Sequence, residues 1–311
     1  MTRARCCRAA GTAALRAPAS LAALALVLSG CIVDAPTPEP SPTPTVEPSA
    51  TARVDAYPLV STAWYGGLVL TFERATSTLD ARGGPVAVEM ALSNPGTEEL
   101  GLGGPIRLVG GDRAIEPSRE TPVPSVPPGG SVETTLIFAV DGDFDVPASA
   151  IVVGRAEEHQ AIVPLVSGSA GAPAAVTLEP ATFALDASAQ ARDLLVTLRS
   201  AELRSDLPDW GVQLPRGSMA LTLTYDVAFR SDFVGGFPFT AENLALTLPD
   251  GRTISARADG HSAPALVVAP RAVVDGLSSR FEVPAPGTGT YRLVIANGTA
   301  TKEIELAIGG G

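Results

Sequence analysis

Short apolar runs with a period of two residues dominate the chain from Arg53 onward, and this feature most constrains its fold. The runs at residues 86–92 and 221–229 are the clearest. Successive side chains of a strand point to opposite faces, so such runs predict strands that bury one face. Only Asp186 to Asp193 and Thr240 to Asn243 show a helical pattern, and it is weak in both. The sequence therefore predicts an all-β fold of antiparallel sheets.

Two dipeptides mark tight turns between these runs. Asn297-Gly298 separates the run at residues 291–295 from the run at residues 303–306, and Asp250-Gly251 follows the run at residues 244–248. Both dipeptides tolerate the positive φ that a short hairpin turn requires. We therefore expect a hairpin at each of these two positions.

The runs recur in the same order in two parts of the chain, which indicates an internal repeat. The first part holds runs at residues 68–72, 86–92, 106–109 and 136–140 and a hairpin at 151–163; the second holds runs at residues 195–198, 221–229, 246–248 and 280–283 and a hairpin at 293–306. Each part has about the length of a β-sandwich. The sequence predicts two tandem immunoglobulin-like antiparallel β-sandwiches, at residues 51–168 and 169–311.

The N-terminus has the features of an export signal. Four arginines precede an apolar stretch at residues 17–28, which is too short to span a bilayer as a helix and is typical of a secretory signal peptide. The stretch ends in Leu28-Ser29-Gly30-Cys31. These residues resemble the lipobox of bacterial lipoproteins. The resemblance implies a leader at residues 1–30 and a lipid thioether on Cys31; the alternative is an ordinary signal peptide with a chance cysteine.

A proline-rich linker follows the cysteine. Residues 34–50 contain six prolines among Thr, Ser and Glu. Such a composition favours polyproline II, which acts as a semi-rigid spacer of roughly 3.1 Å per residue. We therefore interpret residues 31–50 as an acylated cysteine and a tether, and we expect the chain to be held at the outer face of a cell membrane through its acyl group.

The charge and the scarcity of reactive residues exclude several functions. The formal net charge is -11, and the absence of a basic face argues against nucleic acid as a partner. Lys302 is the single lysine, and Cys31 is the single cysteine beyond the leader. His159 and His261 occupy different places in the two repeats, so we interpret both as solvated loop residues. With no HExxH, GxSxG or SxxK motif, the sequence predicts a non-enzymatic protein without a cofactor.

Two further groups are candidate sites. Asp141, Asp143 and Asp145 alternate in an acidic loop that is either a polar turn or a weak Ca²⁺ site, although an EF-hand would need other residues at its sixth and twelfth positions. Four of the nine phenylalanines lie within 11 residues; they either fill the second core or form a contact surface, with Trp210 as a neighbour. These four are Phe229, Phe233, Phe237 and Phe239.

A family resemblance rests on turns that precede strands ending in Phe-x-Val. Val126-Pro127-Pro128-Gly129-Gly130 precedes Phe138-Ala139-Val140, and Val274-Asp275-Gly276 precedes Phe281-Glu282-Val283. Together with a strand that ends in Asn94-Pro95-Gly96, this pattern resembles the immunoglobulin-like immunoprotective extracellular domains of Gram-positive lipoproteins. The resemblance implies a lipid-anchored β-sandwich protein and supplies no catalytic residues.

These observations predict a lipid-anchored extracellular protein of a GC-rich Gram-positive bacterium. We expect it to bind another envelope component, a protein or the cell wall, through loops of its two sandwiches. A carbohydrate-binding or small-ligand-binding module is the alternative, and a hydrolase is a further one. Binding by a carbohydrate module would need an exposed aromatic platform, for which Trp64, Trp210 and the phenylalanines are the candidates.

Overall fold

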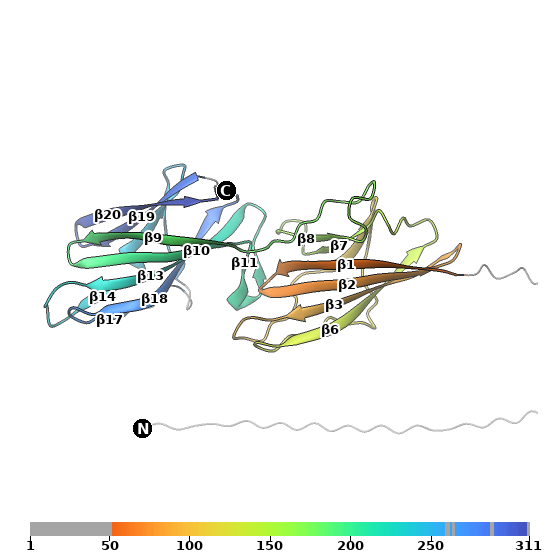
Figure 1. The fold of residues 1–311 in the computed structure, drawn as a ribbon, viewed down its shortest axis with the longest axis horizontal. Helices are drawn as coiled ribbons and strands as arrows, with labels where there is room; N and C mark the ends of the chain where they lie inside the picture. Colours follow the sequence, from red (N-terminus) through yellow and green to blue (C-terminus); the bar gives the residue numbers. More distant parts are fainter. Residues whose placement is uncertain (1–51, 259–261, 263–264, 287–288, 310–311) are drawn as a thin grey trace, which may run out of the picture. The chain divides into compact units, whose positions relative to one another are not determined.

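A computed structural model describes residues 52–258, 262, 265–286 and 289–309 (Figure 1). The predicted leader, Cys31 and the proline-rich linker lie outside the described residues, as does His261. Residues Ser49–Gly311 form one compact unit. Its described part is built from β-strands and two short 3-10 helices, η1 (Pro208–Trp210) and η2 (Ala241–Asn243), so the all-β prediction is confirmed.

The two helical candidates have different outcomes. Thr240 to Asn243 does form a helical turn, η2, because the Thr240 hydroxyl accepts a hydrogen bond from the backbone N–H of Glu242. Asp186 to Asp193 was wrongly predicted as helical, because most of it belongs to strand β9 (Ala181–Ala191). This strand pairs along its length with the next strand, which overrides the weak local pattern. Neither helix in the described part of the chain is long and apolar enough to cross a membrane.

Two four-stranded antiparallel sheets form the first half, which we define as strands β1 to β8. The order of the first sheet is β1 (Arg53–Tyr65), β2 (Leu68–Leu79), β3 (Gly83–Ser93) and β6 (Ser131–Asp141). The order of the second is β5 (Arg113–Ile115), β4 (Ile106–Gly110), β7 (Ala150–Val153) and β8 (Ala161–Pro164). The inward residues of both sheets form one hydrophobic cluster, which includes Phe72, Leu108 and Phe138.

The second half, strands β9 to β20, repeats this plan. Its first sheet has the order β9, β10 (Leu194–Arg204), β13 (Ser218–Phe229) and β18 (Val273–Pro284). Its second sheet has the order β16 (Thr253–Ser255), β15 (Leu244–Thr247), β19 (Gly289–Asn297) and β20 (Ala300–Ile308). A separate hydrophobic cluster, which includes Tyr225, Phe239 and Phe281, lies between these sheets.

The predicted repeat agrees with the topology strand by strand. β9, β10, β13 and β18 take the places of β1, β2, β3 and β6, and β15, β16, β19 and β20 take those of β4, β5, β7 and β8. Even the irregularities recur, since the register shifts just after Phe72 in β2 and just after Leu198 in β10. Both predicted hairpin turns form, with Gly251 and Gly298 at φ +85° and +60°.

The second half carries two additions that the first half lacks. One is a short excursion between β10 and β13, which contains β11 (Asp206–Leu207), η1 and β12 (Val212–Gln213). The other is a two-stranded sheet of β14 (Phe237–Phe239) and β17 (Leu266–Val268). Figure 1 places β14 and β17 at the end of the second half that lies away from β11. Both additions prove to hold the candidate sites.

Candidate functional site

The four clustered phenylalanines divide between core and surface. Phe239 is fully buried, with its ring 6.1 Å from that of Tyr225, and Phe229 is also buried. Phe237 is half-buried, and its ring lies 5.7 Å from that of Phe229. Phe233, in contrast, exposes 65% of its surface. The core interpretation therefore holds for Phe229 and Phe239, whereas Phe233 is available for contact.

Phe233 belongs to an exposed apolar group that we call the apolar tip, defined as Phe233, Val234 and Val267. Val234 is 92% exposed and Val267 is 64% exposed. The loop after β13 turns at Gly236, whose N–H donates to the carbonyl oxygen of Phe233 at 2.9 Å. Gly236 has φ +67°, and a Cβ there would lie 2.6 Å from a backbone oxygen of β17. The turn thus fits closely against β17, which fixes where the tip side chains lie.

An ion pair stabilises the base of the apolar tip. The Asp232 carboxylate accepts hydrogen bonds from Nε and, at 2.6 Å, from Nη2 of Arg271. This bidentate contact lowers the pKa of Asp232, so the pair stays ionised and adds no net charge. The N–H of Arg271 also donates to the carbonyl oxygen of Ser231 at 3.2 Å. The two loops at this end of the molecule are therefore joined, and they present apolar side chains from a defined backbone.

Trp210 does not lie at the apolar tip. It is the last residue of η1, 43% exposed, with the Arg257 guanidinium 5.6 Å from its ring centroid. Since β14 and β17 lie at the other end of the second half, the structure does not bring Trp210 to the apolar tip (Figure 1). The prediction that Trp210 neighbours the phenylalanine cluster is therefore wrong, because the excursion that carries Trp210 folds toward the first half.

The acidic loop does not gather its three carboxylates. Arg113 Nη1 contacts Asp143 at 3.0 Å and Asp141 at 3.5 Å, so one guanidinium pairs with both carboxylates. Asp145 instead accepts a hydrogen bond from the N–H of Ala148. Within the described ranges, no group of three His, Cys, Asp or Glu side chains is placed to hold a metal ion. The loop is a polar turn in its described form.

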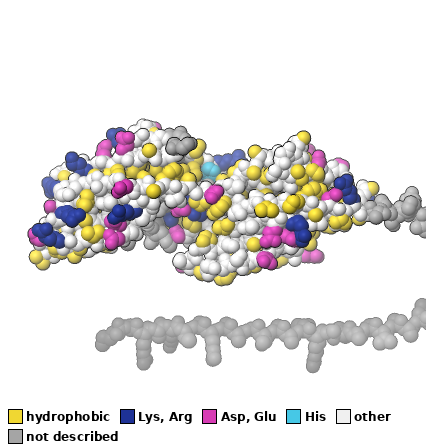
Figure 2. All heavy atoms as spheres, viewed as in Figure 1, with side chains coloured by type: hydrophobic (Ala, Val, Ile, Leu, Met, Phe, Trp, Pro, Cys, Tyr) yellow, Lys and Arg dark blue, Asp and Glu magenta, His cyan; other side chains and the backbone are white. Residues whose placement is uncertain are grey.

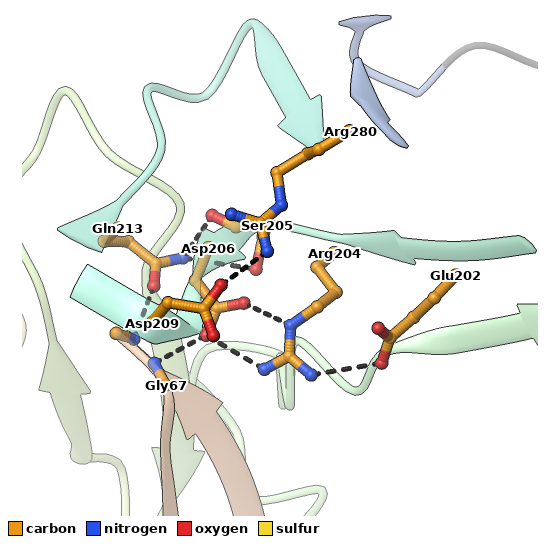
Figure 3. A network of polar contacts seen from close by, with 9 residues as sticks. Gly67, Glu202, Arg204, Ser205, Asp206, Asp209, Gln213 and Arg280 are labelled. Atoms are coloured by element: carbon orange, nitrogen blue, oxygen red, sulfur yellow. Dashed lines mark hydrogen bonds and ion pairs between the residues drawn. The ribbon is translucent and has the colours of Figure 1, made fainter. Parts of the chain in front are cut away.

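The excursion between β10 and β13 holds the β1–β2 turn, and we call residues 205–217 the clasp (Figure 3). The N–H of Gly67 donates to Asp206 Oδ2 at 2.7 Å, and the N–H of Gly66 donates to Gln213 Oε1 at 2.9 Å. Arg204 in turn donates to both carboxylate oxygens of Asp206, from Nε at 2.7 Å and from Nη2 at 3.2 Å. Asp206 and Gln213 are buried, so the turn is fixed by two desolvated acceptors.

Backbone pairing extends the clasp to the β7–β8 loop. The N–H of His159 donates to the carbonyl oxygen of Leu214 at 3.1 Å, and the N–H of Arg216 donates to that of Glu157 at 3.0 Å. His159 Nε2 lies 2.8 Å from the carbonyl oxygen of Ser218, so this nitrogen carries the hydrogen that is donated. His159 is therefore a half-buried junction residue, and its interpretation as a solvated loop residue is wrong.

A buried tyrosine connects the first core to the β7–β8 loop, which pairs with the clasp. Tyr65 is 1% exposed, and its hydroxyl donates to Glu158 Oε2 at 2.7 Å. Burial and the neighbouring carboxylate raise the pKa of Tyr65. Burial also acts to raise the pKa of Glu158, but hydrogen bonds from Tyr65 and Arg155 outweigh it and hold that pKa below its usual range. Glu158 is thus charged and fully engaged in structure.

A small cavity lies beside the clasp. Its volume is about 240 Å³, and it is lined by Tyr65, Arg155, Glu158 and Gln213 among others. Ligand pockets usually measure roughly 300 to 1,000 Å³, so this cavity is smaller than most of them. Its charged groups already bind one another. We therefore assign it no ligand.

Comparisons with known proteins identify no family. No protein-family model matches the chain, and no curated protein matches it. Two solved structures show a weak likeness. One is a conserved hypothetical protein from Bacillus anthracis, 14% identical, which covers 35% of this chain and 96% of its own with a TM-score of 0.27. The other is a conserved domain protein from Bacillus anthracis, 10% identical, which covers 82% of this chain and 92% of its own with a TM-score of 0.26.

Proposed function

We propose that this chain is a lipid-anchored, non-enzymatic binding protein of the outer face of a Gram-positive cell envelope. The observation that carries the proposal is the apolar tip, with Phe233 and Val234 exposed on a turn that is fixed against β17. Loops on a rigid sandwich are a common location for binding residues, and exposed aromatic side chains are effective anchors. The lipobox-like residues before Cys31 and the proline-rich linker support the location.

The partner we propose is an apolar pocket or groove on another envelope component. Full burial of an exposed Phe or Val side chain contributes about 1.5–3 kcal/mol. Burial of both side chains therefore contributes about 3 kcal/mol or more, which changes an affinity by about two orders of magnitude or more. The ion pair at the base of the tip is neutral overall, so this contact should depend weakly on salt. Acidic and basic side chains are also interspersed over the visible face of the molecule (Figure 2).

The test compares the acylated full-length chain with a double variant, Phe233→Ser and Val234→Ser. Binding to washed envelope fragments is measured by co-sedimentation at increasing protein concentration. We expect the double variant to lose saturable binding. Val54→Ser is the matched control, because Val54 is 64% exposed but lies on β1 of the first half. Equal binding by the wild type and the double variant would show that the apolar tip is not the contact surface.

The anchor is tested separately. The full-length chain should incorporate labelled palmitate when expressed in a Gram-positive host, and Cys31→Ser should abolish both the label and retention in the membrane fraction. Cys6→Ser is the control, since Cys6 lies within the proposed leader. A chain that retains the label without Cys31 would contradict the proposed lipidation site.

Carbohydrate binding remains the second proposal, and it rests on Trp210. This ring is partly exposed on the clasp, and Arg257 lies over it. Stacking of a sugar on the ring would quench or shift its fluorescence. Titration with cell-wall glycan fragments, in the wild type and in Trp210→Phe, tests this role; a fluorescence response that is identical in both proteins would remove Trp210 from it.

A further inference from the structure

The lateral edge of the first half is covered by the protein's own chain. Ile162 of β8 and Val176 exchange two backbone hydrogen bonds, each 2.9 Å long. The N–H of Trp64, on the edge strand β1, donates to the carbonyl oxygen of Thr177 at 2.8 Å. The segment Val176–Thr177 thus pairs with the edge strands of both sheets. It satisfies backbone groups that an edge strand otherwise leaves open.

The internal repeat identifies the same position in the second half. Trp64 precedes Tyr65, which pairs with the first residue of β2, and Gln190 precedes Ala191, which pairs with the first residue of β10. Ile162 likewise corresponds to Glu303. The residue after Ile162 lies opposite Ile151, which pairs with Leu108 of β4. The residue after Glu303 lies opposite Leu293, which pairs with Leu246 of β15. Gln190 and Glu303 are therefore the equivalents of the two residues that the Val176–Thr177 segment contacts.

Within the described residues, no segment of the chain pairs with β9 or β20 at this position. β9 and β20 are the last strands of their sheets, and they contact each other as β1 and β8 do. The exposure of the side chains agrees: Ala63 on β1 is fully buried, whereas its equivalent Ala189 on β9 is only half-buried. The backbone N–H groups of Ser188 and Gln190 face away from β10, because residues of an antiparallel strand alternate in direction.

We propose that the edge formed by β9 and β20 binds an extended segment of a partner protein, in the position that Val176–Thr177 occupies in the first half. Backbone hydrogen bonds to Gln190 and Glu303, the equivalents of Trp64 and Ile162, supply the contact, as in other cases of strand addition. The exposed side chains along this edge include Asp186, Lys302, Glu303 and Glu305, and Glu303 is paired with Arg292. The carboxylates of Asp186 and Glu305, which are unpaired among the described residues, disfavour an acidic residue in the bound segment. This inference rests on the proposed role as a binding protein, and it adds a second contact that is independent of the apolar tip.

A synthetic peptide tests the proposal. The probe is the capped hexapeptide Pro-Ala-Ala-Val-Thr-Leu, which copies residues 173–178. It is titrated into the full-length chain in detergent micelles, and amide hydrogen exchange is followed by mass spectrometry. We expect saturable binding and slower exchange in a peptide fragment that contains Ser188 and Gln190. The same hexapeptide with N-methylvaline should not bind, because it lacks the N–H that Val176 uses in the first half.

Matched variants localise the binding site. Gln190→Pro removes the N–H that is equivalent to the donor of Trp64, and we expect it to weaken peptide binding by about tenfold or more. Thr62→Pro removes an N–H on β1 that faces away from β2 and should leave the affinity unchanged. Absence of saturable binding to the wild type, equal affinity for the N-methylated peptide, or protection confined to the first half would overturn the proposal.

One further comparison separates this inference from the proposed function. The double variant of the apolar tip, Phe233→Ser and Val234→Ser, should bind the peptide with wild-type affinity even though it fails to bind envelope fragments. If that variant loses peptide binding as well, the edge is not an independent site and the inference is wrong. If Gln190→Pro alone loses peptide binding while envelope binding through the tip persists, both assignments stand.

Discussion

Replacement of Asp206 by alanine should separate the clasp from the β1–β2 turn. The Asp206 side chain is 3% exposed and accepts hydrogen bonds from Gly67 and Arg204. The substitution leaves the N–H of Gly67 without its acceptor. It also leaves Arg204, whose side chain is 13% exposed, with Glu202 as the remaining acidic partner that Figure 3 draws. A buried N–H thereby loses its acceptor, and a half-buried guanidinium loses its bidentate partner.

The expected cost is large because the pair is buried. Removal of one partner from a buried ion pair costs about 3–5 kcal/mol, most of which is the desolvation of the charge that stays behind. Asp250 and Arg252 form the matched control, since their Nε–Oδ2 distance is also 2.7 Å but their side chains are 51% and 65% exposed. An exposed pair of this kind contributes about 0–1 kcal/mol, so Asp250→Ala should be nearly silent.

Two measurements follow the perturbation. Guanidinium denaturation gives the free energy of unfolding, and hydrogen exchange reports the protection of the Gly67 amide. We expect Asp206→Ala to lose both, and Asp206→Asn to lose less protection at Gly67 because an amide oxygen remains to accept. If Asp206→Ala destabilises the protein no more than Asp250→Ala does, burial does not control the strength of this contact and the reasoning fails.

Three further predictions concern neighbouring groups. Gly67→Ala should lower the free energy of unfolding by about 1–3 kcal/mol or more, because φ is +80° and the new Cβ would lie 2.6 Å from a carbonyl oxygen of η1. Gly129 has φ +63° but open space around it, so Gly129→Ala should lower that free energy by only about 1–2 kcal/mol. Urea unfolding measures both changes. Phe239→Ala should cost about 3–5 kcal/mol and Phe233→Ala within about 0.5 kcal/mol; equal losses in calorimetry would contradict the division between core and surface. The pKa of Glu158 is lowered in the folded state, so its contribution is present above the unfolded pKa and is lost as the pH falls through the folded pKa. The difference in Tm between wild type and Glu158→Gln should therefore be larger at pH 7 than at pH 3, and a constant difference would refute this assignment.

The fold was predictable because alternation and turn chemistry act locally. Hydrophobic residues at every second position determine which face of a strand is buried, and this holds whatever the strand pairs with. The order of such strands then indicated the repeat, which the topology bears out. The error at Asp186 to Asp193 arose where the residues are small and polar on one face. There the pairing of β9 with β10 decides the conformation, and local sequence contains little of that information.

The clasp was not predictable, because its contacts are made by polar residues that follow no periodic pattern in the sequence. The sequence around Arg204, Asp206 and Gln213 is typical of a polar loop. Nothing in it showed that these residues lie against a glycine turn about 140 positions earlier. One signal was present: the second repeat has residues 205–217 where the first has a tight turn between β2 and β3. An insertion in one copy of a repeat is therefore the sequence signal by which such a segment can be found.

The differences between the two halves indicate which surfaces have a specific role. Their sheets have the same strand order, so the shared plan is sufficient for folding and carries no specific role by itself. The features that differ are the clasp, the apolar tip and the edge of β9, and all three belong to the second half. The clasp contacts the β1–β2 turn, whereas in the described part of the chain the side chains of the tip are exposed and no segment pairs with the edge. If both surfaces bind, transfer of the β13–β14 loop onto the first half should transfer the tip contact, but it should leave peptide binding with β9.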